Sequence, residues 1–154
     1  MSNPNPTNGP AVTVASPPPE VIAFATRMYN AARSGDCELF DQVLPVGLSP
    51  NMTNEKGDSL IMLAAYHGHA RLVEILLKYG ANPNSLNDRG QSPLAGAVFK
   101  GETEVIEALL KGNADPYHGS PSAIQAVEIF KQEEKWAKIF EEAPGRGKAA
   151  ESSG

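Results

Sequence analysis

The stretch "LLKYGANPN", residues 76–84, holds two leucines, a glycine and a proline within nine positions. Related lines stand at residues 109–117, "LLKGNADPY", and at residues 43–51, "VLPVGLSPN". Their shared prolines are each separated by thirty-three residues: Pro50, Pro83 and Pro116. A fixed period of this length indicates a repeat protein, in which each unit is one supersecondary structure stacked on the next.

The same offset aligns residues 54–86 with residues 87–119. Apolar residues recur in each copy at positions i, i+1, i+4 and i+5, the spacing of one face of a helix. They are Leu72, Val73, Leu76 and Leu77 in the first copy, and Val105, Ile106, Leu109 and Leu110 in the second. Each copy is therefore predicted to end in a helix.

A shorter helix is predicted before it, opened by the N-cap residues Ser59 and Ser92 and closed by Gly68 and Gly101. The small residues in its middle favour close stacking of adjacent units.

The end of the opening stretch stops the second helix. Gly80 and Asn113 are the residue types that best tolerate a left-handed conformation after a helix. Pro83 and Pro116 then prevent any helical extension. The polar residues that follow, such as 82–90, indicate a projecting loop or a short hairpin.

Two lines share a longer pattern: "NEKGDSLIMLAAYHGH", residues 54–69, and "NDRGQSPLAGAVFKGE", residues 87–102. They resemble the ankyrin repeat family, whose pattern is loosely Asp-x-x-Gly-x-Thr-Pro-Leu-His-x-Ala-Ala-x-x-Gly-His. The register extends back through residues 28–51. After Tyr117, "SPSAIQAVEIF" is similar to one more first helix. The resemblance covers roughly residues 21–142 and implies an all-α ankyrin repeat solenoid of stacked helix-turn-helix units with projecting loops or hairpins.

This reading divides the chain into three parts. Residues 1–19 carry no charge and are crowded with Pro, Asn, Ser and Thr, so we expect a disordered tail. Residues 20–142 form the repeat domain, and residues 143–154 are expected to be a second disordered tail. Removal of residues 144–154 is expected to leave stability nearly unchanged. The domain comprises an N-terminal capping repeat, two full repeats and a divergent C-terminal cap: 20–53, 54–86, 87–119 and 120–142.

Two positions depart from the family pattern. Met62 and Ala95 stand where the family has histidine, which removes hydrogen bonds between loop and helix. Gly96 stands where the family usually has leucine, and a glycine inside a helix costs about 1 kcal/mol relative to alanine.

The resemblance implies that loop tips and the exposed side of each first helix form a groove for protein partners. The positions that match are Arg33, Ser34, Glu55, Lys56, Asp58, Tyr66, His67, Asp88, Arg89, Gln91, Phe99 and Lys100. Tyr66 and Phe99 stand out because aromatic side chains are frequent interface hot spots. Asn84 lies in the loop setting that asparaginyl hydroxylases favour in ankyrin proteins and is a candidate modification site.

Composition narrows the function further. The chain of 154 residues has a net charge of −5 and no cluster of basic residues in its ordered part, which argues against a nucleic-acid partner. No apolar run is long enough to span a membrane. The N-terminus has no secretory signal and Cys37 is the only cysteine, so an intracellular monomer, cytoplasmic or nuclear, is expected.

No catalytic pattern is found. His67 and His69 are two residues apart, the wrong spacing for one helical face, and His118 lies in a predicted loop, so no metal or cofactor is expected. Cys37 has no histidine near it in sequence. The leading hypothesis is a non-catalytic adaptor, scaffold or inhibitor that binds one protein partner. The alternative is a chaperone or regulatory subunit that shields a basic client, which the net charge favours.

Overall fold

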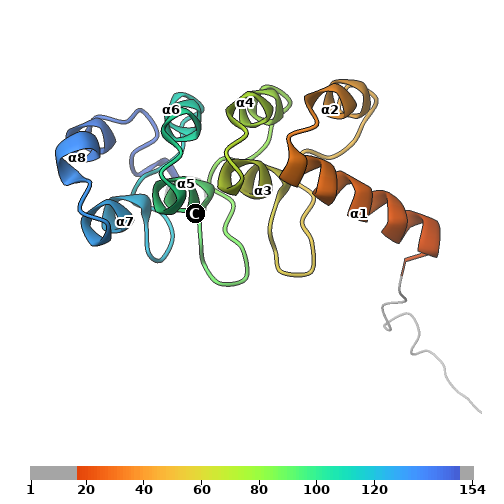
Figure 1. Ribbon diagram of the computed structural model, residues 1–154, viewed down its shortest axis with the longest axis horizontal. Coiled ribbons are helices and arrows are strands. Elements are labelled where there is room, and N and C mark those ends of the chain that lie inside the picture. Colours follow the sequence, from red (N-terminus) through yellow and green to blue (C-terminus); the bar gives the residue numbers. More distant parts are fainter. Residues whose placement is uncertain (1–16, 150–154) are drawn as a thin grey trace, which may run out of the picture.

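The computed structural model describes residues 17–149, which form eight α-helices arranged as consecutive pairs. The helices lie in two rows (Figure 1), and we call them the inner row and the outer row. The inner row consists of α1 (Pro19–Ser34), α3 (Leu60–Tyr66), α5 (Pro93–Lys100) and α7 (Ala123–Ile129). The outer row consists of α2 (Cys37–Val43), α4 (Ala70–Lys78), α6 (Thr103–Lys111) and α8 (Glu133–Glu141). The all-α repeat architecture predicted from the period is confirmed.

Local signals set the ends of these helices as predicted. The hydroxyl of Ser59 accepts a hydrogen bond from the backbone N–H of Met62, and Ser92 caps α5 in the same way. After the outer helices, Gly80 and Asn113 adopt φ values of 95° and 70°. Asn113 is thus one of the uncommon side chains in the left-handed region. The period of thirty-three therefore has a direct structural cause in repeated caps and turns.

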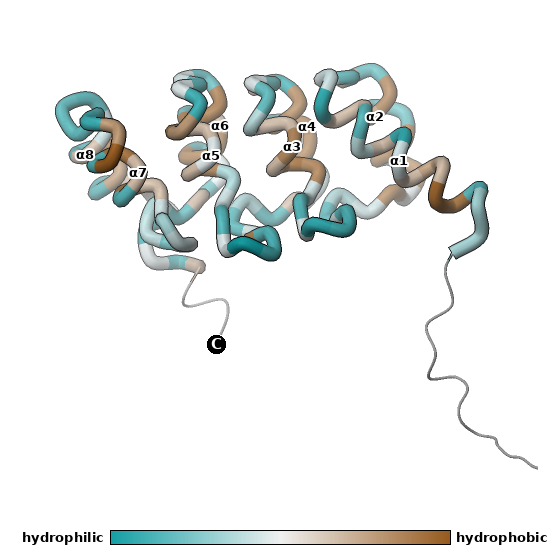
Figure 2. The backbone as a smooth tube through the Cα atoms, turned by 60° about the horizontal axis from the view of Figure 1, so that its bottom comes forward, coloured by the Kyte–Doolittle hydropathy of each residue, from teal (hydrophilic) through white to brown (hydrophobic). Residues whose placement is uncertain are grey.

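The units are held together by side-to-side packing of like helices. Helix α3 packs on α1 and α5, α5 packs on α7, and α4 packs between α2 and α6. Ala64, Ala65 and Ala97 are fully buried in the inner row, where small side chains let the helices approach closely. Hydrophobic segments run through the helices, while the projecting loops are hydrophilic (Figure 2). One continuous core therefore passes through all four units.

Asparagine side chains shape the projecting loops. The Oδ1 atom of Asn54 accepts hydrogen bonds from the backbone of Lys56 and Asp58. The equivalent Asn87, which is 8% exposed, does the same for Arg89 and Gln91. No strand forms in residues 17–149, where the loops contain only isolated bridges such as Thr53 to Ser59. The loops are therefore compact turns and not regular hairpins.

The fourth unit keeps the repeat geometry at a shorter interval. Ser122 caps α7 as the N-cap serines do in the two preceding units, and here Gln125 completes a capping box. The distance from Ser92 to Ser122 is thirty residues instead of thirty-three, so the loop before α7 is shorter by three residues. An alignment at a fixed offset of thirty-three makes the fourth unit look divergent because its preceding loop is shorter. Helices α7 and α8 still pack as a pair.

The C-terminal tail differs from the sequence-based expectation. Residues 143–149 pack on the turn that follows α6, with Ala143 and Ala149 both buried. The backbone N–H of Ala149 donates a hydrogen bond to the buried carboxylate of Asp115 at 3.2 Å, and the guanidinium of Arg146 lies 5.1 Å from the ring centroid of Tyr117. The prediction of a disordered tail is therefore wrong for residues 143–149. Small and polar residues, and not large apolar ones, make this contact.

The expected N-terminal boundary lies close to the start of α1 at Pro19. Residues 1–16 and 150–154, for which disorder was also predicted, lie outside the described part of the chain.

We predict that Asn87→Ala destabilises the fold by about 2 kcal/mol, because several hydrogen bonds at a buried site are lost together. The amide of Asn87 also donates to Asp58 and Gln91, two bonds for which Asn54 has no equivalent. Asn54→Ala is therefore the matched control and should cost about half as much. Urea unfolding of both variants measures the difference, and equal losses would contradict this account of the loops.

We predict that Gly145→Ala destabilises the protein by about 1–3 kcal/mol, the usual cost of overpacking. A Cβ atom at Gly145 would collide with the backbone carbonyl of Asn113. Pro144→Ala changes an exposed neighbour and should stay within about 0.5 kcal/mol of the wild type. Thermal unfolding of the two variants compares them, and an unchanged Gly145→Ala midpoint would show that residues 143–149 contribute nothing to stability.

Candidate protein-binding surface

The last turns of the inner helices bring equivalent residues side by side. Each of these helices is followed by a residue with positive φ: Gly35, Gly68, Gly101 and Lys131. The residues two positions earlier occupy equivalent places in the four units: Arg33, Tyr66, Phe99 and Ile129. A single row of side chains thus crosses the stack from the first unit to the fourth.

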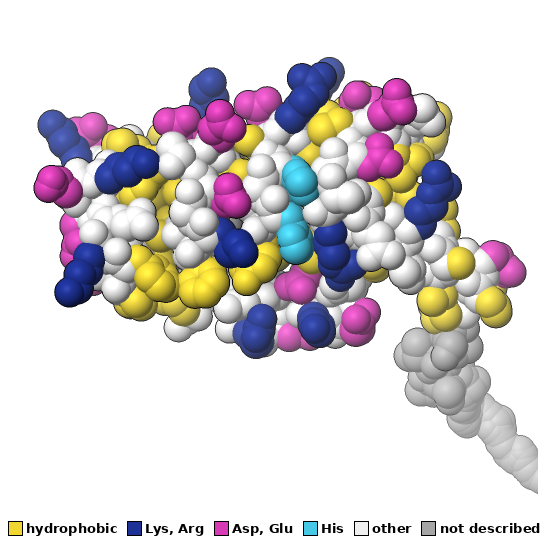
Figure 3. All heavy atoms as spheres, in the orientation of Figure 1, with side chains coloured by type: hydrophobic (Ala, Val, Ile, Leu, Met, Phe, Trp, Pro, Cys, Tyr) yellow, Lys and Arg dark blue, Asp and Glu magenta, His cyan; other side chains and the backbone are white. Residues whose placement is uncertain are grey.

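The two middle positions of this row are aromatic, and Phe130 directly follows the fourth position, Ile129. The rings of Tyr66 and Phe99 are stacked, with centroids 6.4 Å apart and planes inclined by 10°. Phe130 meets Phe99 edge-on at 5.3 Å. We call Tyr66, Phe99 and Phe130 the aromatic ridge; their exposed fractions are 39%, 56% and 40%. Figure 3 shows apolar side chains gathered on this face of the molecule.

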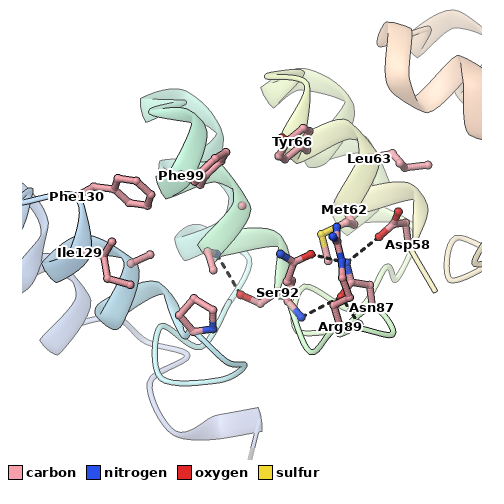
Figure 4. Close-up of a pocket in the computed structure, with 15 residues that line it drawn as sticks. Asp58, Met62, Leu63, Tyr66, Asn87, Arg89, Ser92, Phe99, Ile129 and Phe130 are labelled. Carbon is pink, nitrogen blue, oxygen red and sulfur yellow. Dashed lines mark hydrogen bonds between the residues drawn. The ribbon is translucent and has the colours of Figure 1, made fainter. Parts of the chain in front are cut away.

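A hollow of about 500 Å³ lies beside the aromatic ridge, between the inner helices and the projecting loops (Figure 4). Three of the residues that line it are small: Ala95, Gly96 and Ala126. Apolar side chains from α3 stand on one side, and residues at the end of α7 stand on the other: Met62 and Leu63, then Ile129 and Phe130. The hollow therefore spans three units.

The loops supply the polar edge of the hollow. The amide of Asn87 donates to Asp58 Oδ1 and to Gln91 Oε1, both at 2.9 Å, so these two groups are held in place. The guanidinium of Arg89 also lines the hollow, and among residues 17–149 it has no hydrogen-bond or ion-pair partner. Arg89 is thus a cation available to a bound molecule.

The tips of the two loops carry the charged residues Glu55, Lys56 and Asp88, all exposed. The backbone N–H of Asp88 donates to the carbonyl of Lys56 at 3.0 Å, which couples one loop to the next. These side chains therefore point outward from a connected framework.

Arg33 and Ser34 are engaged within their own helix. Arg33 donates to the side-chain carbonyl of Asn30 at 2.8 Å, and the hydroxyl of Ser34 donates to the backbone carbonyl of Ala31 at 3.2 Å. The Nε2 atom of His69 lies 2.7 Å from the carbonyl of Arg33. His69 therefore links the first two units, as expected for a structural histidine.

His67 and Lys100 lie next to the aromatic ridge. The ammonium of Lys100 is 4.9 Å from the ring centroid of Tyr66, and the His67 ring meets Tyr66 edge-on at 5.5 Å. Partial burial, together with the nearby charges of His69, Arg33 and Lys100, lowers the pKa of His67 below its usual value. At neutral pH the imidazole of His67 is consequently uncharged.

Asn84, the candidate hydroxylation site, joins consecutive loops. Its Oδ1 atom accepts a hydrogen bond from the backbone of Asp115 at 2.7 Å, and Asn51 does the same for Asn82 in the preceding unit. This contact gives the Asn84 amide a structural role. Its modification stays a prediction.

All twelve predicted groove residues lie at the ends of the inner helices or in the projecting loops. Sequence reasoning missed Ile129 and Phe130, because an offset of thirty-three places other residues opposite Phe99. The capping serine at position 122 was the available signal for the correct offset of thirty. The sequence indicated that Gly96 removes a side chain from the stack, but it did not predict the hollow that this opens.

Other kinds of site find little support in residues 17–149. This part of the chain contains no group of three or more His, Cys, Asp or Glu side chains placed to hold a metal ion. It also contains no helix of the length and apolar character required to cross a membrane. Cys37 begins α2 and packs partly against the core.

Comparison with known proteins agrees with the geometry. Residues 28–119 match the family model described as ankyrin repeats in three copies. A Pseudomonas aeruginosa protein named as an ankyrin repeat protein is 46% identical over 48 residues. That match covers 31% of this chain and 28% of the relative, so this chain spans only part of the relative's length. Because the family model covers more than half of its length, this chain belongs to the ankyrin repeat family.

Proposed function

We propose that this protein is a non-catalytic adaptor, scaffold or inhibitor that binds a protein partner through the aromatic ridge and the adjoining hollow, together called the groove. Ankyrin repeats are in general protein-interaction modules, and the family is generally non-catalytic. The observation that carries the proposal is the aromatic ridge, with its three exposed rings. Such rings dominate the energy of many protein interfaces.

These rings lie at the surface of the domain and are not part of its core. Large residues inside the stack, such as Leu72 and Ile106, are essentially unexposed, whereas Phe99 keeps 56% of its surface accessible. Exposed apolar patches on a protein surface commonly mark binding sites. The ridge is continuous across three units, which suits a partner that lies along the stack.

The alternative function is shielding of a basic client, which the net charge of −5 favours. The predicted groove residues carry a different balance, with basic and acidic groups nearly equal in number: Arg33, Lys56, Arg89 and Lys100 against Glu55, Asp58 and Asp88. The acidic excess therefore belongs to residues outside the groove. This distribution favours an apolar interface with polar edges over an acidic cradle.

We predict that the double variant Tyr66→Ala/Phe99→Ala weakens partner binding by about 2 kcal/mol or more, the scale of hot-spot truncations. Its free energy of unfolding should fall by much less than the roughly 3–5 kcal/mol typical of a buried aromatic residue. The partner is first recovered by affinity capture from the native cells and identified. Binding affinity and urea midpoint are then measured on the same protein preparations.

Ile139→Ala is the control for this experiment, because Ile139 is an apolar residue, 45% exposed, on the outer helix α8. It should leave binding unchanged. A collapse of stability in the double variant would mean that the rings belong to the core. Unchanged affinity would place the partner on another face and would sink the proposed function.

We predict that the affinity for the partner changes little between 50 mM and 500 mM NaCl, because an interface centred on aromatic rings depends weakly on charge. Shielding of a basic client by long-range attraction should instead slow association by about tenfold or more over this range. The association rate, measured by stopped flow at both salt concentrations, separates the two functions. A steep fall of this rate as salt rises would favour the alternative.

A further inference from the structure

Gly96 has no evident structural reason to be glycine. It lies in the middle of α5, in an ordinary helical conformation. A Cβ atom placed there would meet only the Tyr66 ring, at 3.7 Å, which is normal van der Waals contact. A glycine inside a helix costs about 1 kcal/mol relative to alanine. The position therefore gives up helix stability without relieving strain or crowding.

The missing side chain opens the hollow. The equivalent residue of the preceding unit is Leu63, which is only 6% exposed and stands at the wall of the hollow. On the other side the equivalent residue is Ala126, also small. Two neighbouring units thus lack bulk at the same place, and the space they leave is bordered by Phe99 and Ile129. An apolar side chain of a bound molecule would find apolar surface on three sides.

The charges around the hollow define what should flank that side chain. Arg89 lines the hollow without a hydrogen-bond or ion-pair partner in the described residues, and Lys100 is held over the Tyr66 ring at 4.9 Å. The carboxylate that lines the hollow, Asp58, already accepts a hydrogen bond from Asn87. Arg89 and Lys100 have no carboxylate partner in the described residues, so either cation is able to pair with a carboxylate of a bound molecule.

We propose that the hollow receives one large aliphatic or aromatic side chain from a short segment of the partner protein, and that an Asp or Glu of the same segment pairs with Arg89 or Lys100. This inference rests on the proposed function and adds the chemistry of the recognised segment. The hollow runs along the exposed aromatic ridge and spans three units, so a peptide segment makes more contact than a compact small molecule. Gly96 is the residue that sets this specificity.

Selection of a phage-displayed random peptide library on the immobilised wild-type protein tests the recognised chemistry. The expected result is enrichment of peptides in which Leu, Met, Ile or Phe stands within a few residues of Asp or Glu. Recovery of no binding peptide, or of peptides without that combination, overturns the inference.

The best selected peptide is then labelled and its affinity measured by fluorescence polarisation for three variants. Gly96→Leu fills the hollow with the residue found in the preceding unit and should weaken binding at least about tenfold. Arg89→Gln/Lys100→Gln removes the charges that pair with the peptide carboxylate and should weaken binding. Glu107→Leu, which adds a leucine at an exposed position of α6, is the control and should bind as the wild type does.

A further measurement guards against misfolding of Gly96→Leu. Replacing the apolar residue of the peptide by Ala should weaken its binding to the wild type about tenfold or more, with no change to the protein. If Gly96→Leu is folded by urea unfolding and binds the peptide as tightly as the wild type, the inference is wrong.

The variant Tyr66→Ala/Phe99→Ala separates this inference from the proposed function. Peptide binding lost in that variant but retained in Gly96→Leu overturns the hollow as the recognition site and leaves the groove in place. Binding retained in both variants overturns both. Self-association in sedimentation equilibrium that Gly96→Leu abolishes would make a second copy of this chain the occupant, and would also overturn the inference.

Discussion

The side-to-side contact between successive helix pairs is the interaction on which the rest of this protein depends. One pair has an apolar face that it cannot bury alone, so each unit is stable only against its neighbours. The core accordingly runs through the whole stack, from Met28 in α1 to Phe140 in α8. Because adjacent inner helices must approach closely, small residues such as Ala64 and Ala97 are buried at their contacts.

The same stacking creates the groove. The inner helices α3, α5 and α7 each begin at a serine cap, and every inner helix is followed by a left-handed residue, so residues at equal distances from these ends lie beside one another. A pattern along the chain becomes a row across the surface in this way. The Tyr66 and Phe99 rings stack because the helices that carry them do. The loops keep their shape through Asn54 and Asn87, which hold the polar edge near the ridge.

The C-terminal end of the described chain involves a different kind of contact. Residues 143–149 are mostly small or polar, yet two of their alanines are buried against the turn after α6. Asp115 organises that turn, since its carboxylate accepts hydrogen bonds from the backbone of Tyr117 and Ala149. A buried carboxylate needs such partners because an unsatisfied charge is expensive to bury. The hydrogen bond from its backbone to Asp115, more than buried apolar area, attaches this segment.

The sequence by itself determined the repeat, the helix pairs and the core positions of the two central units. These features depend on local physical chemistry, because a serine cap, an apolar helical period or a residue suited to positive φ acts within a few neighbouring positions. The exposure of Tyr66 and Phe99 at equivalent places followed from the same register. Most of the fold and the first part of the groove were therefore predictable.

Only the tertiary structure decided the rest. The shorter loop before Ser122 changes which residues face Phe99, and the capping serine was the one local sign of that change. Gly96 alone indicated a missing side chain. The hollow also depends on the next unit, in which the small Ala126 leaves the same space open and Ile129 borders it. Burial of Ala149 likewise depends on Asp115, thirty-four residues away. Each of these features is a contact between distant residues, which stacking of the units creates and local sequence does not encode.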